Sequence, residues 1–185
     1  MTKKKSAPTE KTNDAAMAGY IAGLNDPEIG KRHEAVEHLV KGGKTAVAPL
    51  IDLLASTTDN DLRWYAAVAL GRIGAPAIAP ALDAMKKNTD RDFRRYTAAA
   101  LGSMGEPAVD PLIDAMGSDD PTLRGFISLA LCRIGKPAVG PLSKRLNDAD
   151  EIIRSCSSLT LWQMGETGIP AIVDAVKNEH KKTSR

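Results

Sequence analysis

Apolar and small residues recur along the chain at helical spacing, in short runs that end at glycine. In one run Leu62, Ala66, Leu70 and Ile73 lie three or four positions apart, the spacing that places side chains on one face of an α-helix. Gly74 ends this run, and a second apolar run begins almost immediately after it. The pattern predicts short helices in pairs, separated by tight glycine turns, and no β-strands.

The same pattern repeats along most of the chain. The anchor glycines Gly43, Gly74, Gly105, Gly135 and Gly165 are spaced by 31, 31, 30 and 30 residues. An arginine lies eleven residues before each of them: Arg32, Arg63, Arg94, Arg124 and Arg154. An acidic residue lies four positions before each arginine: Glu28, Asp59, Asp90, Asp120 and Asp150. Agreement of five registers at three positions indicates structural repeats.

Each repeat is predicted to contain two helices. The first, called helix B here, begins at the acidic residue, whose carboxylate suits an N-cap, and ends at the glycine in a left-handed C-terminal conformation. The expected B segments are 28–41, 60–73, 91–104, 121–134 and 151–164.

The second helix of each repeat, helix A, follows the glycine and is marked by proline. Pro76, Pro107 and Pro137 fall at or near its first turn, where a missing N–H group costs nothing. A further proline, at Pro49, Pro80, Pro111 or Pro141, is expected to kink the first turn or to delay the regular helix.

Units of this kind bury their apolar stripes only by stacking on one another, so we predict an all-α solenoid, an α-α superhelix of eleven helices. The solenoid should span residues 14–178 in about five repeats of 30–31 residues, with a helix at each end acting as a cap. The polar segments 1–13 and 179–185 are expected to be flexible basic tails.

The repeat pattern, for example RIGAPAIAPAL after Gly71, resembles the HEAT-like repeats of the phycobilin lyase type over roughly residues 15–178. The resemblance implies a right-handed, armadillo-like solenoid whose B helices line a concave face. It also implies that the residues one, two and five places after each arginine point away from the core. Those positions hold His33, Glu34, Glu37, Trp64, Tyr65, Val68, Arg95, Tyr96, Ala99, Gly125, Phe126, Leu129, Ser155, Cys156 and Leu159.

Aromatic and basic residues gather at these implied surface positions. Trp64, Tyr65, Tyr96 and Phe126 would form a band across the middle repeats, flanked by basic residues two places before the anchor glycines, including Arg72 and Arg133. Trp, Tyr and Arg are enriched at binding hot spots. We therefore expect a non-catalytic scaffold that binds a protein or peptide partner on the concave face, through this band together with Arg95, His33, Glu34 and Glu37.

The net charge does not point to nucleic acid as the partner. The formal charge is only +2, and Glu34, Glu37 and Asp61 weaken the basic field of the expected surface. Nucleic acid is therefore a lesser alternative, because aromatic and arginine side chains can also stack on bases.

The periodic acidic and basic residues are interpreted as structural. An aspartate and an arginine four positions apart on a helix form an ordinary cap and ion pair, which could also bridge neighbouring repeats. We expect Asp59, Asp90, Asp120 and Asp150 with the five arginines to form a ladder that sets the stacking.

An enzymatic role is the main alternative. The segment RHEAVEHL resembles the His-Glu motif of deoxyhypusine hydroxylases, where several copies supply ligands to a di-iron centre. This chain has a single copy, His33-Glu34, so we expect no metal and no cofactor unless a second copy of the chain completes the site. A bilin lyase would act with a partner subunit, and nothing beyond Trp64, Tyr65 and Tyr96 suggests a bilin pocket.

The two cysteines and the ends of the chain bear on location. Cys132 and Cys156 form no CxxC pair, and no histidine is placed to activate Cys156 as a nucleophile. No apolar segment follows the basic start, and no long apolar window occurs. We expect a cytoplasmic protein, with pairing to a second copy left open.

Overall fold

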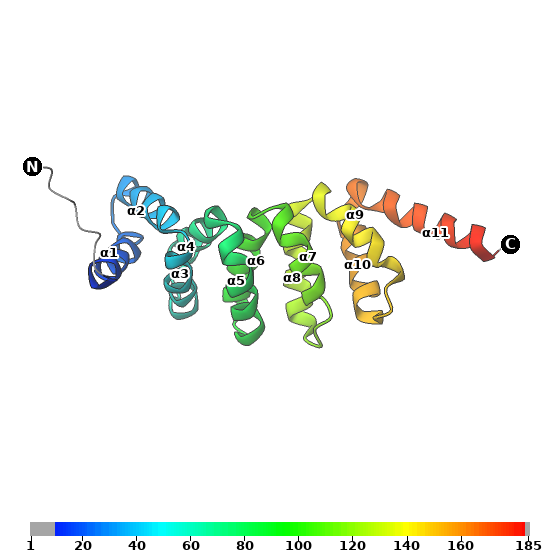
Figure 1. Cartoon of the computed structure of the whole chain (residues 1–185), viewed down its shortest axis with the longest axis horizontal. Coiled ribbons are helices and arrows are strands. Elements are labelled where there is room, and N and C mark those ends of the chain that lie inside the picture. The colour runs from blue at the N-terminus through cyan, green and yellow to red at the C-terminus, as the bar shows by residue number, and fades with distance from the viewer. Residues whose placement is uncertain (1–9, 184–185) are drawn as a thin grey trace, which may run out of the picture.

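The computed structural model describes residues 10–183, which form a row of paired α-helices following the chain order from one end to the other (Figure 1). No β-strand occurs within this range. The eleven α-helices are α1 (Glu10–Gly23), α2 (Ile29–Gly42), α3 (Lys44–Ser56), α4 (Asn60–Ile73), α5 (Ala75–Lys87), α6 (Arg91–Ser103), α7 (Val109–Ala115), α8 (Pro121–Ile134), α9 (Lys136–Lys144), α10 (Glu151–Gln163) and α11 (Ile169–Thr183). Short 3₁₀ turns cover Glu106–Ala108, Arg145–Asn147 and Gly165–Thr167.

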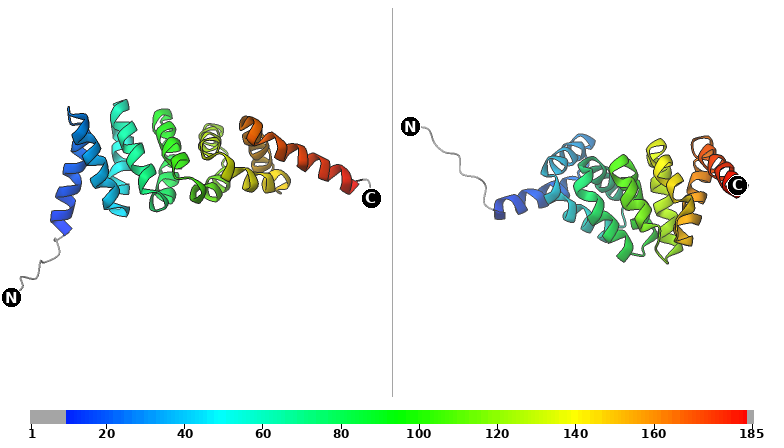
Figure 2. Two further views of the ribbon diagram at one scale, coloured as in Figure 1. Left: turned by 90° about the horizontal axis from the view of Figure 1, so that it is seen from above. Right: turned by 45° about the vertical axis from the view of Figure 1, so that its right-hand side comes forward.

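The row is an α-solenoid, which confirms the predicted fold class (Figure 2). The B helices are α2, α4, α6, α8 and α10, and each boundary lies within one residue of its predicted position. The A helices are α3, α5, α7, α9 and α11, and α1 precedes the first complete repeat. The spacing of apolar residues and the caps were therefore sufficient to place the helices along the chain.

Aspartate caps four of the five B helices, as predicted. The Asp59 carboxylate accepts hydrogen bonds from the backbone N–H groups of Asp61 and Leu62 at 2.7 and 3.1 Å. Asp120 and Asp150 cap α8 and α10 in the same way, and Asp90 caps α6 with a single bond from the N–H of Phe93. The prediction was wrong for Glu28, which makes no side-chain cap and pairs instead with Lys31 at 3.0 Å.

The anchor glycines require a conformation that other residues avoid. All five have positive φ, between 55° and 75°. At Gly74 the angles are φ 75° and ψ −134°, which lie outside the left-handed helical region that we predicted. This conformation requires glycine even more strongly, because any L-residue with a side chain is strained at a positive φ combined with such an extended ψ.

Proline acts on the A helices less than expected. Pro76 and Pro137 lie at the first or second position of α5 and α9, as predicted. Pro49, Pro80 and Pro141 lie within helices that have already begun, so the expected delay of the regular helix is wrong there. In the third repeat, by contrast, a 3₁₀ turn at Glu106–Ala108 precedes α7, just before Pro111.

The core runs continuously between the two rows of helices, and small residues let neighbouring B helices approach closely. Leu39, Leu70, Leu101 and Leu131 stand at one register of α2, α4, α6 and α8, and all are fully buried. A Cβ added at Gly102 of α6 would lie 2.8 Å from Cδ of Arg133 on α8. Close approach of this kind brings side chains of successive B helices into direct contact.

The ends of the row differ from the prediction. Helix α1 begins at Glu10 and α11 continues to Thr183, so the helices extend beyond the expected limits of 14 and 178. Extending a helix that has already formed costs little, which accounts for the extra turns. The remaining parts of the predicted tails, residues 1–9 and 184–185, lie outside the described residues.

Helix α11 meets the prediction of a cap only in part, because Ala171 and Ile172 pack against the core but other apolar residues of the helix are exposed. Its apolar residues Ile169, Val173 and Val176 are 42%, 43% and 47% exposed. A capping helix would instead present a polar outer face. Within residues 10–183, no helix is both long enough and apolar enough to cross a lipid bilayer.

Candidate binding groove on the B helices

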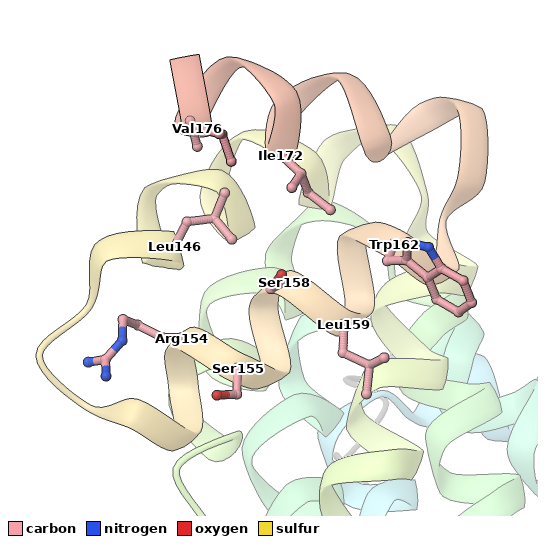
Figure 3. A pocket seen from close by; sticks show the side chains of 9 residues that line it. Leu146, Arg154, Ser155, Ser158, Leu159, Trp162, Ile172 and Val176 are labelled. Atoms are coloured by element: carbon pink, nitrogen blue, oxygen red, sulfur yellow. The ribbon is translucent and has the colours of Figure 1, made fainter. Parts of the chain in front are cut away.

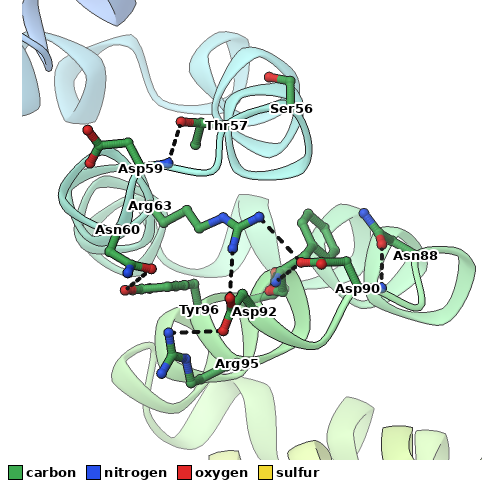
Figure 4. A network of polar contacts seen from close by, with 12 residues as sticks. Ser56, Thr57, Asp59, Asn60, Arg63, Asn88, Asp90, Asp92, Arg95 and Tyr96 are labelled. Carbon is green, nitrogen blue, oxygen red and sulfur yellow. Dashed lines mark hydrogen bonds and ion pairs between the residues drawn. The ribbon is translucent and has the colours of Figure 1, made fainter.

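Two arginines of the ladder, Arg63 and Arg94, pair with carboxylates of the following repeat rather than with their own caps. Arg63 on α4 contacts Asp90 at 3.4 Å and Asp92 at 3.3 Å, both from the following repeat (Figure 4). Arg94 on α6 contacts Asp120 at 2.7 Å. The expected ion pair within one helix is therefore wrong, because the N-cap aspartates turn toward their own backbone N–H groups. The bridge between neighbouring repeats, also expected, is present at Arg63 and Arg94, whose long side chains reach the next cap.

The other three arginines of the ladder form no ion pair with a described residue. Arg124 donates to the carbonyl oxygen of Ser118 at 2.7 Å, and Arg154 donates to that of Asp148 at 2.6 Å. The guanidinium of Arg32 lies 5.3 Å from the ring centroid of Tyr65. Among the ladder arginines, cross-repeat ion pairs are thus found only at Arg63 on α4 and Arg94 on α6.

One polar network joins the ladder to the surface of the B helices. Asp92, held by the buried Arg63, also pairs with Arg95 at 3.0 Å (Figure 4). The Arg95 guanidinium lies 4.9 Å from the ring centroid of Tyr96, whose hydroxyl donates to Asn60 at 3.2 Å. Asp92 and Asn60 were not predicted from the sequence. Asp92 lies two residues after the cap Asp90, as Asp61 lies after Asp59, and this shared register could have suggested it.

The same surface contains a groove, called the B-helix groove here, with a volume of about 410 Å³. Its walls come from three successive B helices, α4, α6 and α8. The lining residues are Trp64, Ala67, Val68, Arg72, Arg95, Tyr96, Ala99, Ala100, Ser103 and Arg133. Five of the predicted partner-binding residues therefore lie together: Trp64, Arg72, Arg95, Tyr96 and Arg133.

The aromatic band is only partly on the surface. Trp64 is 51% exposed and Tyr96 is half-buried, whereas Tyr65 is only 7% exposed. The expectation that Tyr65 points outward is therefore wrong. Its ring packs between the rings of Trp64 and His33, with centroid distances of 4.8 and 6.1 Å. Tyr65 therefore contacts Trp64, which lines the groove, but does not line the groove itself.

The three groove arginines differ in their partners. Arg72 binds both carboxylate oxygens of Glu37 on α2, at 2.6 and 3.0 Å. This bond lowers the pKa of Glu37 and raises that of Arg72. Arg95 pairs with Asp92, whereas Arg133 forms no ion pair or side-chain hydrogen bond with any described residue.

The remaining predicted site residues lie outside the groove. His33 and Glu34 are exposed on α2, in the first repeat. Phe126 lines a neighbouring pocket of about 780 Å³ with Leu129, Cys132 and Gln163. Burial raises the pKa of the Cys132 thiol, which makes it a poor nucleophile at neutral pH.

No part of the described chain gathers a metal-ligand set. Within it, no three His, Cys, Asp or Glu residues are placed so that they could hold a metal ion. The His33-Glu34 pair by itself offers two ligands. A di-iron centre needs more than this pair provides.

A third pocket, of about 670 Å³, lies at the C-terminal end of the row and was not predicted from the sequence (Figure 3). Leu159 and Trp162 of α10 face it, at 53% and 65% exposure, together with Ile172 and Val176 of α11. Among the described residues no B helix follows α10, which leaves Trp162 exposed. Leu129 holds the register of Leu159 on α8 and is equally exposed at 53% although α10 follows it, so the exposure of Leu159 is not specific to this end.

The fold defines a helical-repeat protein with a groove formed by successive B helices. The family model for HEAT repeats matches residues 17–102 and 78–162. The chain therefore belongs to the HEAT-repeat family.

The comparisons with individual proteins add little to this assignment. No curated protein matches the chain. Among solved structures, an engineered protein from a structural genomics consortium is similar with 20% identity and a TM-score of 0.34, covering 89% of this chain and 86% of that one. A designed armadillo repeat protein is similar with 17% identity and a TM-score of 0.33, covering 85% and 91%.

Proposed function

We propose that this protein is an interaction scaffold that binds a partner protein segment in the B-helix groove. The observation that carries the proposal is the half-exposed indole of Trp64 beside Tyr96 and three arginines, in a groove shared by three helices. An exposed indole that packs in a groove gains a large contact area on binding at little cost in conformational entropy.

The geometry of the groove also suits a scaffold. Neighbouring repeats are tied by the buried Arg63 and Arg94, so the three helices hold their side chains in fixed relative positions. A preorganised surface loses less entropy when a partner binds. The cytoplasmic setting that we propose agrees with the free thiols of Cys132 and Cys156, since reducing compartments keep cysteines unpaired.

A bilin-lyase or hydroxylase-like activity stays a prediction from the repeat sequence. Tyr65 is removed from the surface that a bilin would contact, and His33-Glu34 stand apart from the groove. The scaffold function is therefore the one that the geometry supports best.

The test compares two tryptophans that are both exposed. Extracts of the native host are passed over the immobilised protein, and partners captured by the wild type are identified and their affinities measured. Trp64→Ala should lose the captured partner while keeping the wild-type melting temperature. Trp162→Ala, at the C-terminal end and outside the groove, is the matched control and should keep it.

Two results would contradict the proposal. The first is a Trp64→Ala protein that folds and binds the partner as tightly as wild type. The second is loss of binding in Trp162→Ala alone, which would move the site to the C-terminal pocket.

A further inference from the structure

A contact between α2 and α4 has a counterpart position in the B-helix groove, but the acidic partner is missing there. In the first contact Arg72, nine residues after Arg63, holds the carboxylate of Glu37, which lies five residues after Arg32. An arginine in one B helix thus binds a glutamate in the B helix before it.

The same register occurs between α6 and α8. Arg133 lies nine residues after Arg124, and Ala99 lies five residues after Arg94. Both residues line the B-helix groove. Alanine stands where the first contact has glutamate, so the arginine at this register faces an open groove instead of a carboxylate.

The stem of Arg133 is held in place while its charged end has no described partner. A Cβ added at Gly102 would lie 2.8 Å from Cδ and 2.9 Å from Cβ of Arg133, so these methylene groups pack directly on the glycine. Arg72 and Arg95 differ, because each is already paired with a carboxylate. Arg133 is therefore the groove arginine whose charge the described side chains leave uncompensated.

We propose that the B-helix groove binds an acidic peptide segment, one of whose glutamate or aspartate carboxylates pairs with Arg133 as Glu37 pairs with Arg72. This inference rests on the proposed scaffold function and adds the chemical class of the partner. The charge of the groove supports it, since its lining includes three arginines and no carboxylate. Trp64 and Tyr96 offer apolar surface to residues that flank the acidic one.

The probe is a phage-displayed library of random peptides of about twelve residues, selected on the full-length protein with counter-selection on Trp64→Ala. Selected peptides are synthesised with a fluorescent label and titrated by fluorescence polarisation. We expect the peptides to share an acidic residue at a fixed distance from an apolar or aromatic one. Replacing that acid by its amide should weaken binding to the wild type about tenfold, as the loss of a charge-assisted hydrogen bond predicts.

Protein variants test the contact from the other side. Arg133→Met should weaken binding of the acidic peptide about tenfold and make the acid-to-amide change nearly neutral, the signature of a direct pair in a double-mutant cycle. Lys136→Met, an exposed cation at the start of α9 and outside the groove, is the control and should bind normally.

A carboxylate built into the chain gives an independent readout. Ala99→Glu should place a carboxylate where Glu37 stands in the first contact and should reduce peptide affinity, whereas the uncharged Ala99→Gln, of similar size, should reduce it much less. Equal losses in the two variants would show that volume and not charge matters, and would overturn the inference. Melting temperatures of both variants report whether the fold is kept.

The failures of the two proposals are distinguishable. If selected peptides depend on Trp64 but carry no acid, or bind Arg133→Met as well as wild type, the scaffold function stands and the acidic partner is wrong. If no peptide survives counter-selection and a labelled oligothymidine binds in an Arg133-dependent way instead, both proposals are wrong.

Discussion

The middle and the C-terminal end of the solenoid use the same repeat residue in different ways. Arg94 is 2% exposed, donates from Nε to the carbonyl oxygens of Met85 and Asn88, and pairs with Asp120 at 2.7 Å. Arg154 occupies the same register in α10, yet among the described residues it bonds only to carbonyl oxygens of its own preceding loop. The arginine links two repeats only where the N-cap aspartate of the following repeat lies close enough to form an ion pair with it.

The aromatic residues also differ in exposure. Tyr65 is nearly buried, with its ring against His33 of α2, whereas Trp162 at the C-terminal end is 65% exposed. Exposure differs even at one register, because Tyr96, at the position of Tyr65 in the next B helix, is half-buried. The neighbours in adjacent repeats therefore help to decide whether a side chain is core or surface.

The largest expected effect is the difference in stability between variants of Tyr65 and Trp162. Tyr65→Ala should lower the free energy of unfolding by about 3 kcal/mol or more, because a buried aromatic truncation leaves a cavity. Trp162→Ala should change it by less than about 0.5 kcal/mol, as exposed substitutions do. Urea unfolding followed by circular dichroism measures both. Equal losses would show that Trp162 is covered in solution.

The ladder arginines give the next comparison. Arg94→Met should cost about 3 kcal/mol, since it removes a buried cation and leaves buried carbonyl oxygens without a donor. Arg154→Met should cost about 1 kcal/mol or less, because its partners lie in a partly exposed loop. Chemical denaturation of the two variants checks the difference, and similar midpoints would refute a special role for the middle arginines.

The anchor glycines should differ by their place in the row although their φ angles agree. Gly105→Val forces a β-branched residue to φ 74° and should cost about 3 kcal/mol. Gly165→Val, at φ 59°, should cost less, because only α11 depends on that turn and its apolar face is already exposed. Thermal melts followed by circular dichroism measure both.

Gly102→Ala is a useful third variant in this series. It should cost less than Gly105→Val, because it keeps an allowed helical backbone, but it is not neutral, since its Cβ meets Arg133. Gly140→Ala, whose Cβ would meet nothing within 4 Å, is the matched control. A Gly102→Ala protein as stable as Gly140→Ala would argue against the close contact of α6 and α8.

The smallest expected effect is a difference in acid sensitivity. The backbone N–H of Leu123 and then Arg94 hold the pKa of Asp120 below its ordinary 3.8, so the stability that it contributes is present above about pH 4 and is lost as the pH falls through the lowered folded value. Asp148 has a lowered pKa as well, chiefly from the backbone N–H of Asp150 and then from Arg145, but it ties only its own loop.

Asp120→Asn should therefore flatten the loss of global stability on acidification more than Asp148→Asn does. Urea midpoints measured at neutral pH and at two acidic values provide the comparison. Superimposable acid profiles for Asp120→Asn and the wild type would show that the tie to Arg94 does not contribute to stability in this pH range.

The sequence by itself determined the helices and the repeat. Glycines that need positive φ, aspartates that cap, and apolar residues at helical spacing act through local backbone geometry, which each segment expresses without its neighbours. For this reason all B helices begin and end within one residue of the positions that Asp59, Gly74 and their equivalents predict.

Only the tertiary structure decided which residues meet between repeats. The partner of Arg94 proved to be Asp120 and not Asp90, Tyr65 became core, and Arg133 faced Ala99 where Arg72 faces Glu37. These outcomes depend on the rise and rotation from one repeat to the next, which arise from packing at positions such as Gly102. Period and spacing along the chain carry no measure of that rotation, so the groove could be predicted as a surface but not as a set of contacts.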